Sequence, residues 1–167
     1  EYKDDAAVLE LPNGQCLIST TDFFTPIVNN PYDFGRIAAA NALSDVYAMG
    51  GSPVLALAIL GFPVDKLSTD VARQILAGAK EVCKNANIPL AGGHTIDSLE
   101  PIFGLAVNGL VQKENIRKNS TAQEGDLILL TKPIGTGILA TAHKREIISA
   151  VDLDAAIQVM VQLNTEG

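Results

Sequence analysis

Residues 33–49 constrain the fold more than any other stretch, because 37–49 within them is almost wholly apolar and carries only a few polar side chains. The stretch ends at Gly50 and Gly51, a pair that predicts the C-terminal end of a helix. A helix that is apolar on most sides is buried on most sides. Asn41 and Asp45 lie about one turn apart and share one face, where an unpaired carboxylate is costly. We therefore expect Asp45 to bind a metal ion or, alternatively, the backbone at the glycine pair.

The pattern before this helix predicts a β-hairpin made of strands 6–11 and 16–21. The Asn-Gly pair at 13–14 is typical of a two-residue type I′ turn. In the register of such a turn Asp5 lies directly opposite Asp22, and like charges in a cross-strand pair are destabilising. A divalent cation or a nucleotide hydroxyl between the carboxylates would remove this conflict. The alternative is that both carboxylates are solvated at the strand ends.

The rest of the chain predicts further strands and helices and one domain boundary. Before the boundary we expect a strand, a helix and two strands, at 54–62, 69–86, 88–91 and 103–112. The polar segment 113–125 is the expected boundary. After it we expect a strand at 126–131 and helices at 135–144 and 154–163. The prediction is an N-terminal domain over 1–117 and an incomplete second domain over 118–167.

A glycine pair follows the predicted strand at 88–91 and is itself followed by two polar side chains. Gly92 and Gly93 are expected to form a turn, and two glycines after an apolar strand allow a bulge or a close approach of the backbone to a ligand. His94 could donate a hydrogen bond to a phosphate, and Thr95 could add a hydroxyl group. For His94 taken alone, a structural imidazole held by hydrogen bonds is the favoured interpretation.

A second glycine motif points to another class of ligand. Residues 135–140 match the relaxed G-x-G-x-x-A pattern of dinucleotide-binding proteins, and Asp152 or Asp154 lies near the distance expected for the acid that binds the ribose. However, Lys132 and Pro133 interrupt the step from strand to turn, and no returning strand is predicted. The pattern is therefore weak. The sequence has no P-loop and no paired Cys or His ligands for zinc.

The charge and the cysteines exclude several classes of partner. The net charge is −7, which disfavours binding to nucleic acid or to an anionic membrane. Cys16 and Cys83 each lie in an apolar stretch, which predicts buried, reduced thiols and a cytoplasmic protein. The sequence has no secretory signal and no apolar run of transmembrane length. It begins at Glu1 rather than at Met, so we expect a preceding segment.

Together these residues resemble the selenophosphate synthetase (selenide, water dikinase) family of the aminoimidazole ribonucleotide synthetase-like superfamily. The resemblance runs over nearly the whole chain, and it is most specific over 19–51. The matching stretches are 4–15 (DDAAVLELPNGQ), 19–51 (STTDFFTPIVNNPYDFGRIAAANALSDVYAMGG), 90–97 (LAGGHTID), 98–109 (SLEPIFGLAVNG) and 125–139 (GDLILLTKPIGTGIL).

The resemblance implies an α+β fold. It implies a two-layer mixed or antiparallel sheet with helices on one face, in a domain that closes a β-barrel with its twin in a homodimer. The start of an α/β domain should follow. The implied reaction is magnesium-dependent and uses ATP, selenide and water to make selenophosphate, AMP and phosphate. The alternatives are another ATP-dependent kinase or synthetase of the superfamily acting on a small metabolite, or a non-catalytic ATP-binding module.

The resemblance also assigns roles to single residues. It implies that Asp5 and Asp45 bind Mg²⁺. It places the nucleotide contacts at Tyr2, Lys3, Asp4, Asp22, Asp45, Gly93, His94 and Thr95. It assigns no catalytic residue within the chain, because the family's Cys or selenocysteine and its catalytic Lys are expected upstream of Glu1, and a further metal-binding Asp is expected downstream. Cys16 and Cys83 do not match the position of the nucleophile.

Overall fold

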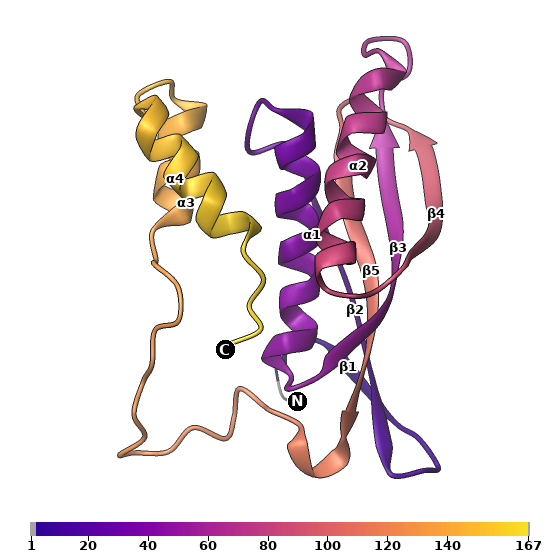
Figure 1. The fold of residues 1–167 in the computed structure, drawn as a ribbon, viewed down its shortest axis with the longest axis vertical. Helices are drawn as coiled ribbons and strands as arrows, with labels where there is room; N and C mark the ends of the chain where they lie inside the picture. The colour runs from indigo at the N-terminus through magenta and orange to yellow at the C-terminus, as the bar shows by residue number, and fades with distance from the viewer. Residues whose placement is uncertain (1–2, 167) are drawn as a thin grey trace.

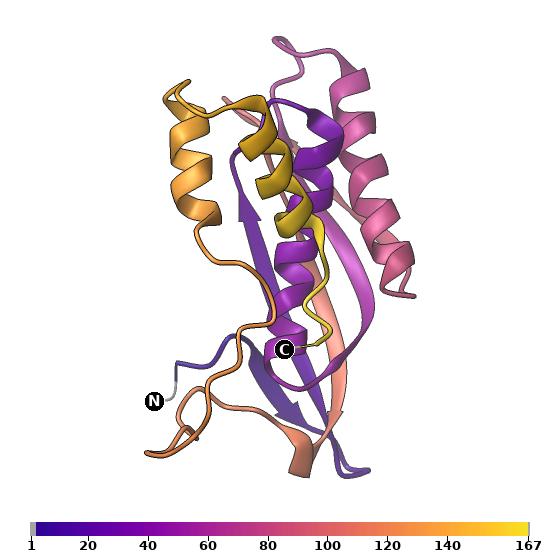
Figure 2. The ribbon, with the colours of Figure 1, turned by 60° about the vertical axis from the view of Figure 1, so that its left-hand side comes forward.

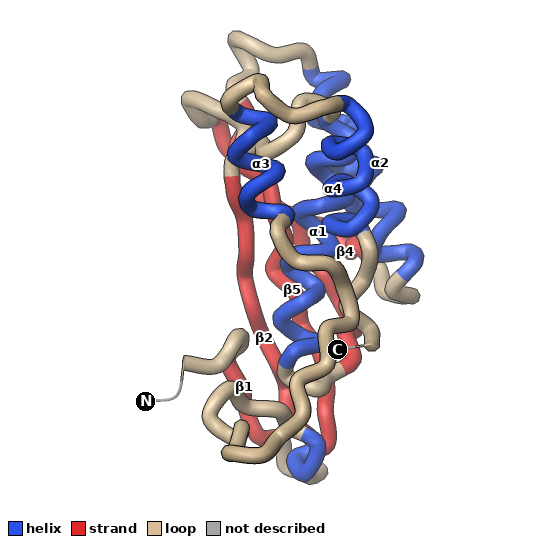
Figure 3. Tube along the Cα trace, turned by 90° about the vertical axis from the view of Figure 1, so that its left-hand side faces the viewer, coloured by secondary structure: helices blue, strands red, loops and turns tan. Residues whose placement is uncertain are grey.

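Five strands form one mixed sheet, and helices cover one of its faces (Figures 1 and 3). The computed structural model describes residues 3–166. The strand order is β1-β2-β5-β3-β4, with β3 and β4 parallel and the other neighbours antiparallel. The strands are β1 Ala7–Glu10, β2 Gln15–Phe24, β3 Ser52–Phe62, β4 Leu90–Asp97 and β5 Ile102–Gln112. The predicted α+β class with a mixed sheet is confirmed.

Helices α1 (Pro31–Ala48) and α2 (Thr69–Asn85) pack on the covered face. A 3₁₀ turn at Lys113–Asn115 follows β5, and helices α3 (Thr136–Lys144) and α4 (Ala150–Val161) end the chain. In Figure 2, α4 lies against α1 on the side away from the sheet. No helix within residues 3–166 has both the length and the apolar character needed to cross a bilayer.

Alternation along the strands separates the two faces of the sheet. On β2, Cys16 and Ile18 point to the helices and are buried. On the opposite face, Phe23 of β2 is 49% exposed and Leu57 of β3 is 38% exposed. One apolar face of the sheet is therefore packed and the other is open.

The predicted helix over 33–49 is α1, and it begins two residues earlier. Asn30 caps it, with its Oδ1 accepting hydrogen bonds from the backbone N–H groups of Tyr32 (2.9 Å) and Asp33 (3.2 Å). Pro31 occupies the first turn, where its missing N–H costs nothing. As predicted, α1 is buried on most sides, because it lies between the sheet, α2 and α4.

Glycines allow α1 and α2 to approach at backbone distance. A Cβ atom on Gly35 of α1 would lie 1.9 Å from the backbone oxygen of Ile75. A Cβ atom on Gly78 of α2 would lie 2.1 Å from the backbone oxygen of Tyr32. Neither position has room for a side chain, so the two glycines fix how close the helices pack.

The predicted two-residue turn of the hairpin is wrong. The Leu11 N–H donates to the Gln15 oxygen (2.8 Å) and the Gly14 N–H donates to the Leu11 oxygen (3.1 Å), which leaves a three-residue loop over 12–14. Pro12 suits the first corner of a type I turn, and Gly14 takes the left-handed conformation (φ 81°) that closes such loops. The register shifts by one residue, so the predicted pairing of Asp5 with Asp22 is also wrong.

Three other predictions of local structure differ from the structure. Gly92 and Gly93 form no turn, because β4 runs through both of them as an edge strand beside β3. The pairing of β4 with β3 shifts by one residue between Leu90 and Gly93, as in the bulge that such glycines allow. Residues 126–131 form no strand, since no neighbouring strand lies beside them within residues 3–166, and a lone strand leaves its backbone groups unpaired. The last helix begins at Ala150 rather than at the predicted residue 154, because Ser149 caps it.

Candidate functional site

The polar face of α1 meets the polar end of β2 in two matched side-chain contacts. The Thr20 hydroxyl donates to the Asp45 carboxylate (Oγ1 to Oδ2, 2.6 Å). The amide of Asn41 donates to the Asp22 carboxylate. Four residues along a helix span about 6 Å, and two residues along a strand span about 6.7 Å. Because these spacings are similar, the two residues of α1 can contact the two residues of β2 at the same time. The sequence placed Asn41 and Asp45 on one helix face, and the structure confirms this.

Asp45 lies in an unfavourable environment for a carboxylate. Burial raises its pKa above the ordinary value of 3.8. The hydrogen bond from Thr20 opposes this shift, whereas the nearby carboxylates of Asp22 and Asp5 raise the pKa further. The charges of Asp5 and Asp22 therefore both act on Asp45, although not through the predicted strand register. We refer to these three residues as the carboxylate cluster.

The negative charge of this cluster has no counter-charge among the described residues. Within residues 3–166, none of its three carboxylates forms an ion pair with Lys, Arg or His. The alternative in which Asp45 binds the glycine pair after α1 is wrong, because the N–H groups of Gly50 and Gly51 donate to backbone oxygens instead. In the described part of the chain, the side-chain hydrogen bonds to Asp45 and Asp22 come from neutral donors.

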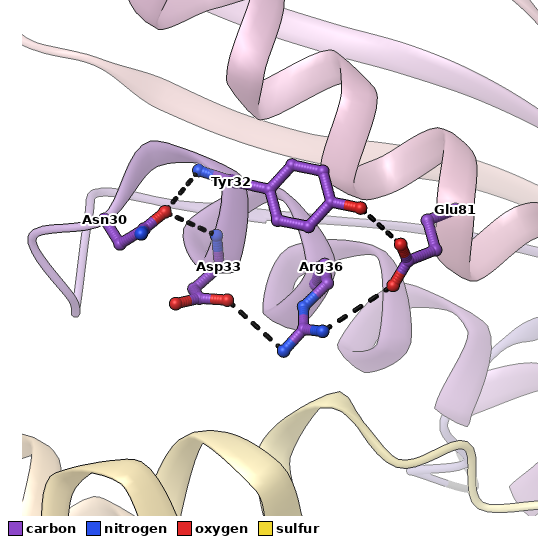
Figure 4. A network of polar contacts seen from close by, with 5 residues as sticks. All are labelled: Asn30, Tyr32, Asp33, Arg36 and Glu81. Carbon is purple, nitrogen blue, oxygen red and sulfur yellow. Dashed lines mark hydrogen bonds and ion pairs between the residues drawn. The ribbon is translucent and has the colours of Figure 1, made fainter.

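Two other acidic side chains at α1, Asp33 and Glu81, are paired with a positive charge (Figure 4). Arg36 forms ion pairs with Asp33 (3.2 Å) and with Glu81 of α2 (3.6 Å). The Tyr32 hydroxyl also donates to Glu81, and this hydrogen bond is the main cause of the raised pKa of Tyr32. The contacts join α1 to α2 and balance the acids with a guanidinium. This network is structural, in contrast to the uncompensated cluster.

The carboxylate cluster suits a metal ion that takes only some of its ligands from the protein. No group of three or more Asp, Glu, His or Cys side chains within residues 3–166 could hold a metal ion on its own. Mg²⁺ does not need such a group, because it is usually bound by one or two carboxylates together with waters and substrate phosphates. Asp5 and Asp45 could supply these carboxylates, and Asp22 lies beside them.

The other predicted residues at the N-terminus lie near this end of the sheet or outside the described residues. The Asp4 carboxylate accepts from the Asn119 N–H (3.0 Å), and the Lys3 backbone oxygen accepts from the Asn119 side chain (3.0 Å). Asp4 therefore already holds the segment that follows the 3₁₀ turn. Tyr2, a predicted nucleotide contact, lies outside the described residues.

Gly93, His94 and Thr95 do not join the cluster within one chain. In the register of the sheet, Asp22 pairs with Leu105, Leu105 with Ala58, and Ala58 with Gly93. Three strand spacings separate Asp22 from Gly93, which is about 14 Å. The three β4 residues are exposed and line a cavity of about 500 Å³ against α2.

The favoured structural interpretation of His94 is wrong. The exposed imidazole makes no hydrogen bond to another residue of the described part of the chain. The dinucleotide alternative also loses its support, because the described residues just before Gly135 form no strand and the Ser149 hydroxyl donates to the Asp152 carboxylate (2.7 Å) at the start of α4.

Sequence reasoning missed Thr20, which donates a hydrogen bond to Asp45. The signal was available, because Thr20 and Asp22 are two residues apart on a strand and so share a face. That face could only be matched to α1 once the structure had placed β2 beneath the helix.

The chain matches a known protein family over most of its length. The family described as "AIR synthase related protein, N-terminal domain" matches residues 3–111, and the chain belongs to this family. Within it, "Selenide, water dikinase" of Escherichia coli (strain K12) is 55% identical over all 167 residues, which is 48% of that protein. The chain thus spans about half the length of the curated relatives that it matches.

Solved structures agree on the fold. The protein tt0281 of Thermus thermophilus superposes with a TM-score of 0.85 at 23% identity, over 98% of this chain and 55% of that one. AaThiL, solved in complex with AMPPCP and TMP, superposes with a TM-score of 0.79 at 24% identity, over 95% of this chain and 52% of that one. Both matches extend beyond residue 111, so the arrangement of nearly the whole chain recurs in other proteins.

Proposed function

We propose that this chain is the magnesium- and nucleotide-binding part of a selenide, water dikinase, which converts ATP, selenide and water into selenophosphate, AMP and phosphate. The observation that carries the proposal is the carboxylate cluster, uncompensated by any cation within residues 3–166, in a chain 55% identical to selenide, water dikinase of Escherichia coli. A nucleotide site built on carboxylates is consistent with a sequence that has no P-loop.

Each member of the cluster has a separate task. Asp5 and Asp45 hold Mg²⁺, which when bound neutralises phosphate charge during phosphoryl transfer. Asp22 contacts the nucleotide, together with Tyr2, Lys3 and Asp4 from the N-terminal segment. Thr20 and Asn41 act as positioning residues, because their hydrogen bonds fix the Asp45 and Asp22 carboxylates before a ligand arrives. A preorganised arrangement of this kind lowers the cost of reorganisation during the reaction.

The nucleotide site is completed by a second copy of the chain. Gly93, His94 and Thr95 lie three strands away from the cluster, so we place their contact with the nucleotide in the twin of a homodimer. The open face of the sheet, with Phe23 and Leu57 exposed, offers an apolar surface for that twin. Leu57→Asp should convert the dimer to a monomer in light scattering, while Val64→Asp, at an exposed loop residue, serves as the control.

The two thiols are not assigned to the selenium chemistry. Cys16 and Cys83 are buried, and burial raises the pKa of Cys83 to about 11, which disfavours a reactive thiolate. Buried reduced thiols support a cytoplasmic location. The acidic net charge supports binding of metal cations, through which an anionic nucleotide can be held, and no role in binding nucleic acid or membranes.

Product analysis tests the reaction. The protein at its natural full length is supplied with ATP, Mg²⁺ and selenide under anaerobic conditions and is followed by ³¹P NMR. The proposal predicts selenophosphate, AMP and phosphate in equal amounts. ADP formed with a phosphorylated metabolite in place of selenophosphate would favour another kinase of the superfamily, and nucleotide binding without turnover would favour a non-catalytic module.

A further inference from the structure

A cavity of about 530 Å³ lies between α1 and the two C-terminal helices. This volume is within the range of small-molecule sites. Asn41 and Ser44 line it from α1, and Lys132, Thr136 and Lys144 line it from the segment before α3 and from the ends of that helix. Figures 1 and 2 show the surrounding elements, with α4 beside α1 and α3 packed with α4.

The charge of the cavity is opposite to that of the protein. The chain carries a net charge of −7, yet the only charged side chains that line this cavity within residues 3–166 are Lys132 and Lys144. Lys132 Nζ donates to the Gln162 backbone oxygen (2.7 Å), which leaves further protons of its ammonium group for a ligand. Lys144 is exposed and forms no ion pair within the described residues. The cavity therefore favours an anion.

The neutral groups in the wall suit the oxygen atoms of a phosphate. The hydroxyls of Ser44 and Thr136 and the amide of Asn41 can each donate a hydrogen bond. Gly135 is the residue before α3 and has no side chain to cap it, so the first N–H groups of the helix have no side-chain cap among the described residues. These donors add to the two ammonium groups in the same cavity.

The cavity is also next to the carboxylate cluster. Asn41 lines the cavity and at the same time donates a hydrogen bond to Asp22. A single side chain thus belongs to the wall of the cationic cavity and also contacts the anionic cluster. Phosphoryl transfer produces an anion that must leave the metal-bound nucleotide, and a neighbouring cationic compartment can receive it.

We infer that this cavity is a phosphate subsite, in which Lys132 and Lys144 bind the phosphate group of the product beside the metal-nucleotide site. The identity of the product rests on the proposed function. The binding of phosphate itself rests on the cavity, its two lysines and its neutral donors. Phosphate bound here would be held by charge-assisted hydrogen bonds, which are about twice as strong as neutral ones.

Calorimetry with inorganic phosphate tests the subsite. The protein at its natural full length is titrated without magnesium, so that the carboxylate cluster repels phosphate rather than binding it. Lys144→Gln should weaken phosphate binding by about tenfold, the loss expected for one hydrogen bond to a charged group. Lys144→Arg should retain binding. Lys84→Gln removes an exposed lysine of α2 that does not line this cavity, so it should change nothing.

A second variant protects the result against a folding defect. Lys132→Gln also removes the bond to Gln162, so its effect is accepted only if its melting temperature is close to that of the wild type. Phosphate binding that is unchanged in both glutamine variants, or absent in the wild type, overturns the inference. A parallel titration with Mg²⁺ and a non-hydrolysable ATP analogue separates the two proposals. Unchanged nucleotide binding in the lysine variants that have lost phosphate binding supports a distinct subsite, whereas joint loss of both overturns it.

Discussion

Residues 3–117 and residues 118–166 both contain apolar segments, but these segments are mostly buried in the first region and mostly exposed in the second. In the first region apolar residues form a continuous core between the sheet, α1 and α2. In the second, only Ala156 and Ile157 are buried. The two most exposed large apolar side chains of the described chain lie there, Ile128 at 96% and Leu127 at 91%, and Leu129 beside them is 85% exposed. An apolar run that predicts a strand thus forms none in this region.

The difference shows that an apolar run specifies a strand only where a neighbouring strand is present. The β3 segment lies between β4 and β5, so its backbone groups and its side chains both find partners. Residues 126–131 have no such neighbour within residues 3–166 and remain an extended loop. An exposed apolar run of this kind marks a surface that needs a partner.

The largest expected difference between the regions comes from a core aromatic side chain. Phe34 is 1% exposed and packs edge-on against Phe24 and Phe103. Phe34→Ala should lower the free energy of unfolding by about 3–5 kcal/mol, because it leaves a cavity in a packed core. Denaturant unfolding measures this change. A loss below about 1 kcal/mol would mean that the first region is less tightly packed than the structure indicates.

A smaller loss is expected where α1 and α2 touch. Alanine favours helices by about 1 kcal/mol over glycine, so Gly78→Ala would stabilise an exposed helix. Here a Cβ atom would lie 2.1 Å from the Tyr32 backbone oxygen, so we expect a net loss of about 1–3 kcal/mol. Thermal unfolding shows whether Gly78→Ala lowers or raises the stability. Ala77→Gly, at an exposed position of the same helix, is the comparison. Stabilisation by Gly78→Ala would contradict the close approach.

The ionised carboxylate of Asp45 should lower the free energy of unfolding of the packed region at neutral pH. Its folded-state pKa is raised from 3.8, so the native state holds its proton more tightly than the unfolded state. Without metal, stability therefore falls as the pH rises from about 3.8 through the raised pKa. Asp45→Asn keeps an acceptor for Thr20 and removes this fall, so it should melt higher than the wild type at pH 7. A lower melting temperature of Asp45→Asn at this pH would contradict the prediction.

Mg²⁺ should reverse that order. Binding to the native state stabilises it by about 2.7 kcal/mol when the free ligand is at 100 times its Kd. Titrated with Mg²⁺ and nucleotide at pH 7, the wild type should gain stability and Asp45→Asn should gain little. Equal gains in the two proteins would remove Asp45 from the metal site.

The smallest effect is expected in the loop. Leu129→Ser replaces a side chain that is 85% exposed, so it should change the stability of the 167-residue chain by less than about 0.5 kcal/mol. The same change in the protein at its natural full length should cost more, because a partner surface would then be present. Denaturant unfolding of both proteins gives the comparison. A loss above about 1 kcal/mol in the short chain would show that the loop is already packed.

The sequence predicted most elements of the first region because their signals are local. The apolar run ending at Gly50 predicted α1, and the apolar periodicity of 69–86 predicted α2. The hairpin turn was mispredicted because Asn-Gly is compatible with two turn types, and Pro12 selected the longer one. The slip of one residue separated Asp5 from its expected partner, although both remain near Asp45.

The candidate site was predictable in composition and not in geometry. The position of Asp45 in an apolar helix was a local signal of a functional carboxylate. The contact between α1 and β2, and the distance from the cluster to Gly93, depend on strand order, which no local pattern encodes. Tertiary arrangement therefore decided which predicted residues meet within one chain.

The central claim is that the uncompensated carboxylates of α1 and β2 hold a magnesium-bound nucleotide. Isothermal titration of the full-length protein with a non-hydrolysable ATP analogue, with and without Mg²⁺, tests it directly. Asp45→Asn should weaken binding at least about tenfold with Mg²⁺, since even indirect partners of a metal contribute that much, and should change it little without Mg²⁺. Asp65→Asn, at an exposed loop carboxylate outside the cluster, should match the wild type in both series. Equal affinities of the wild type and Asp45→Asn in the presence of Mg²⁺ would contradict the account.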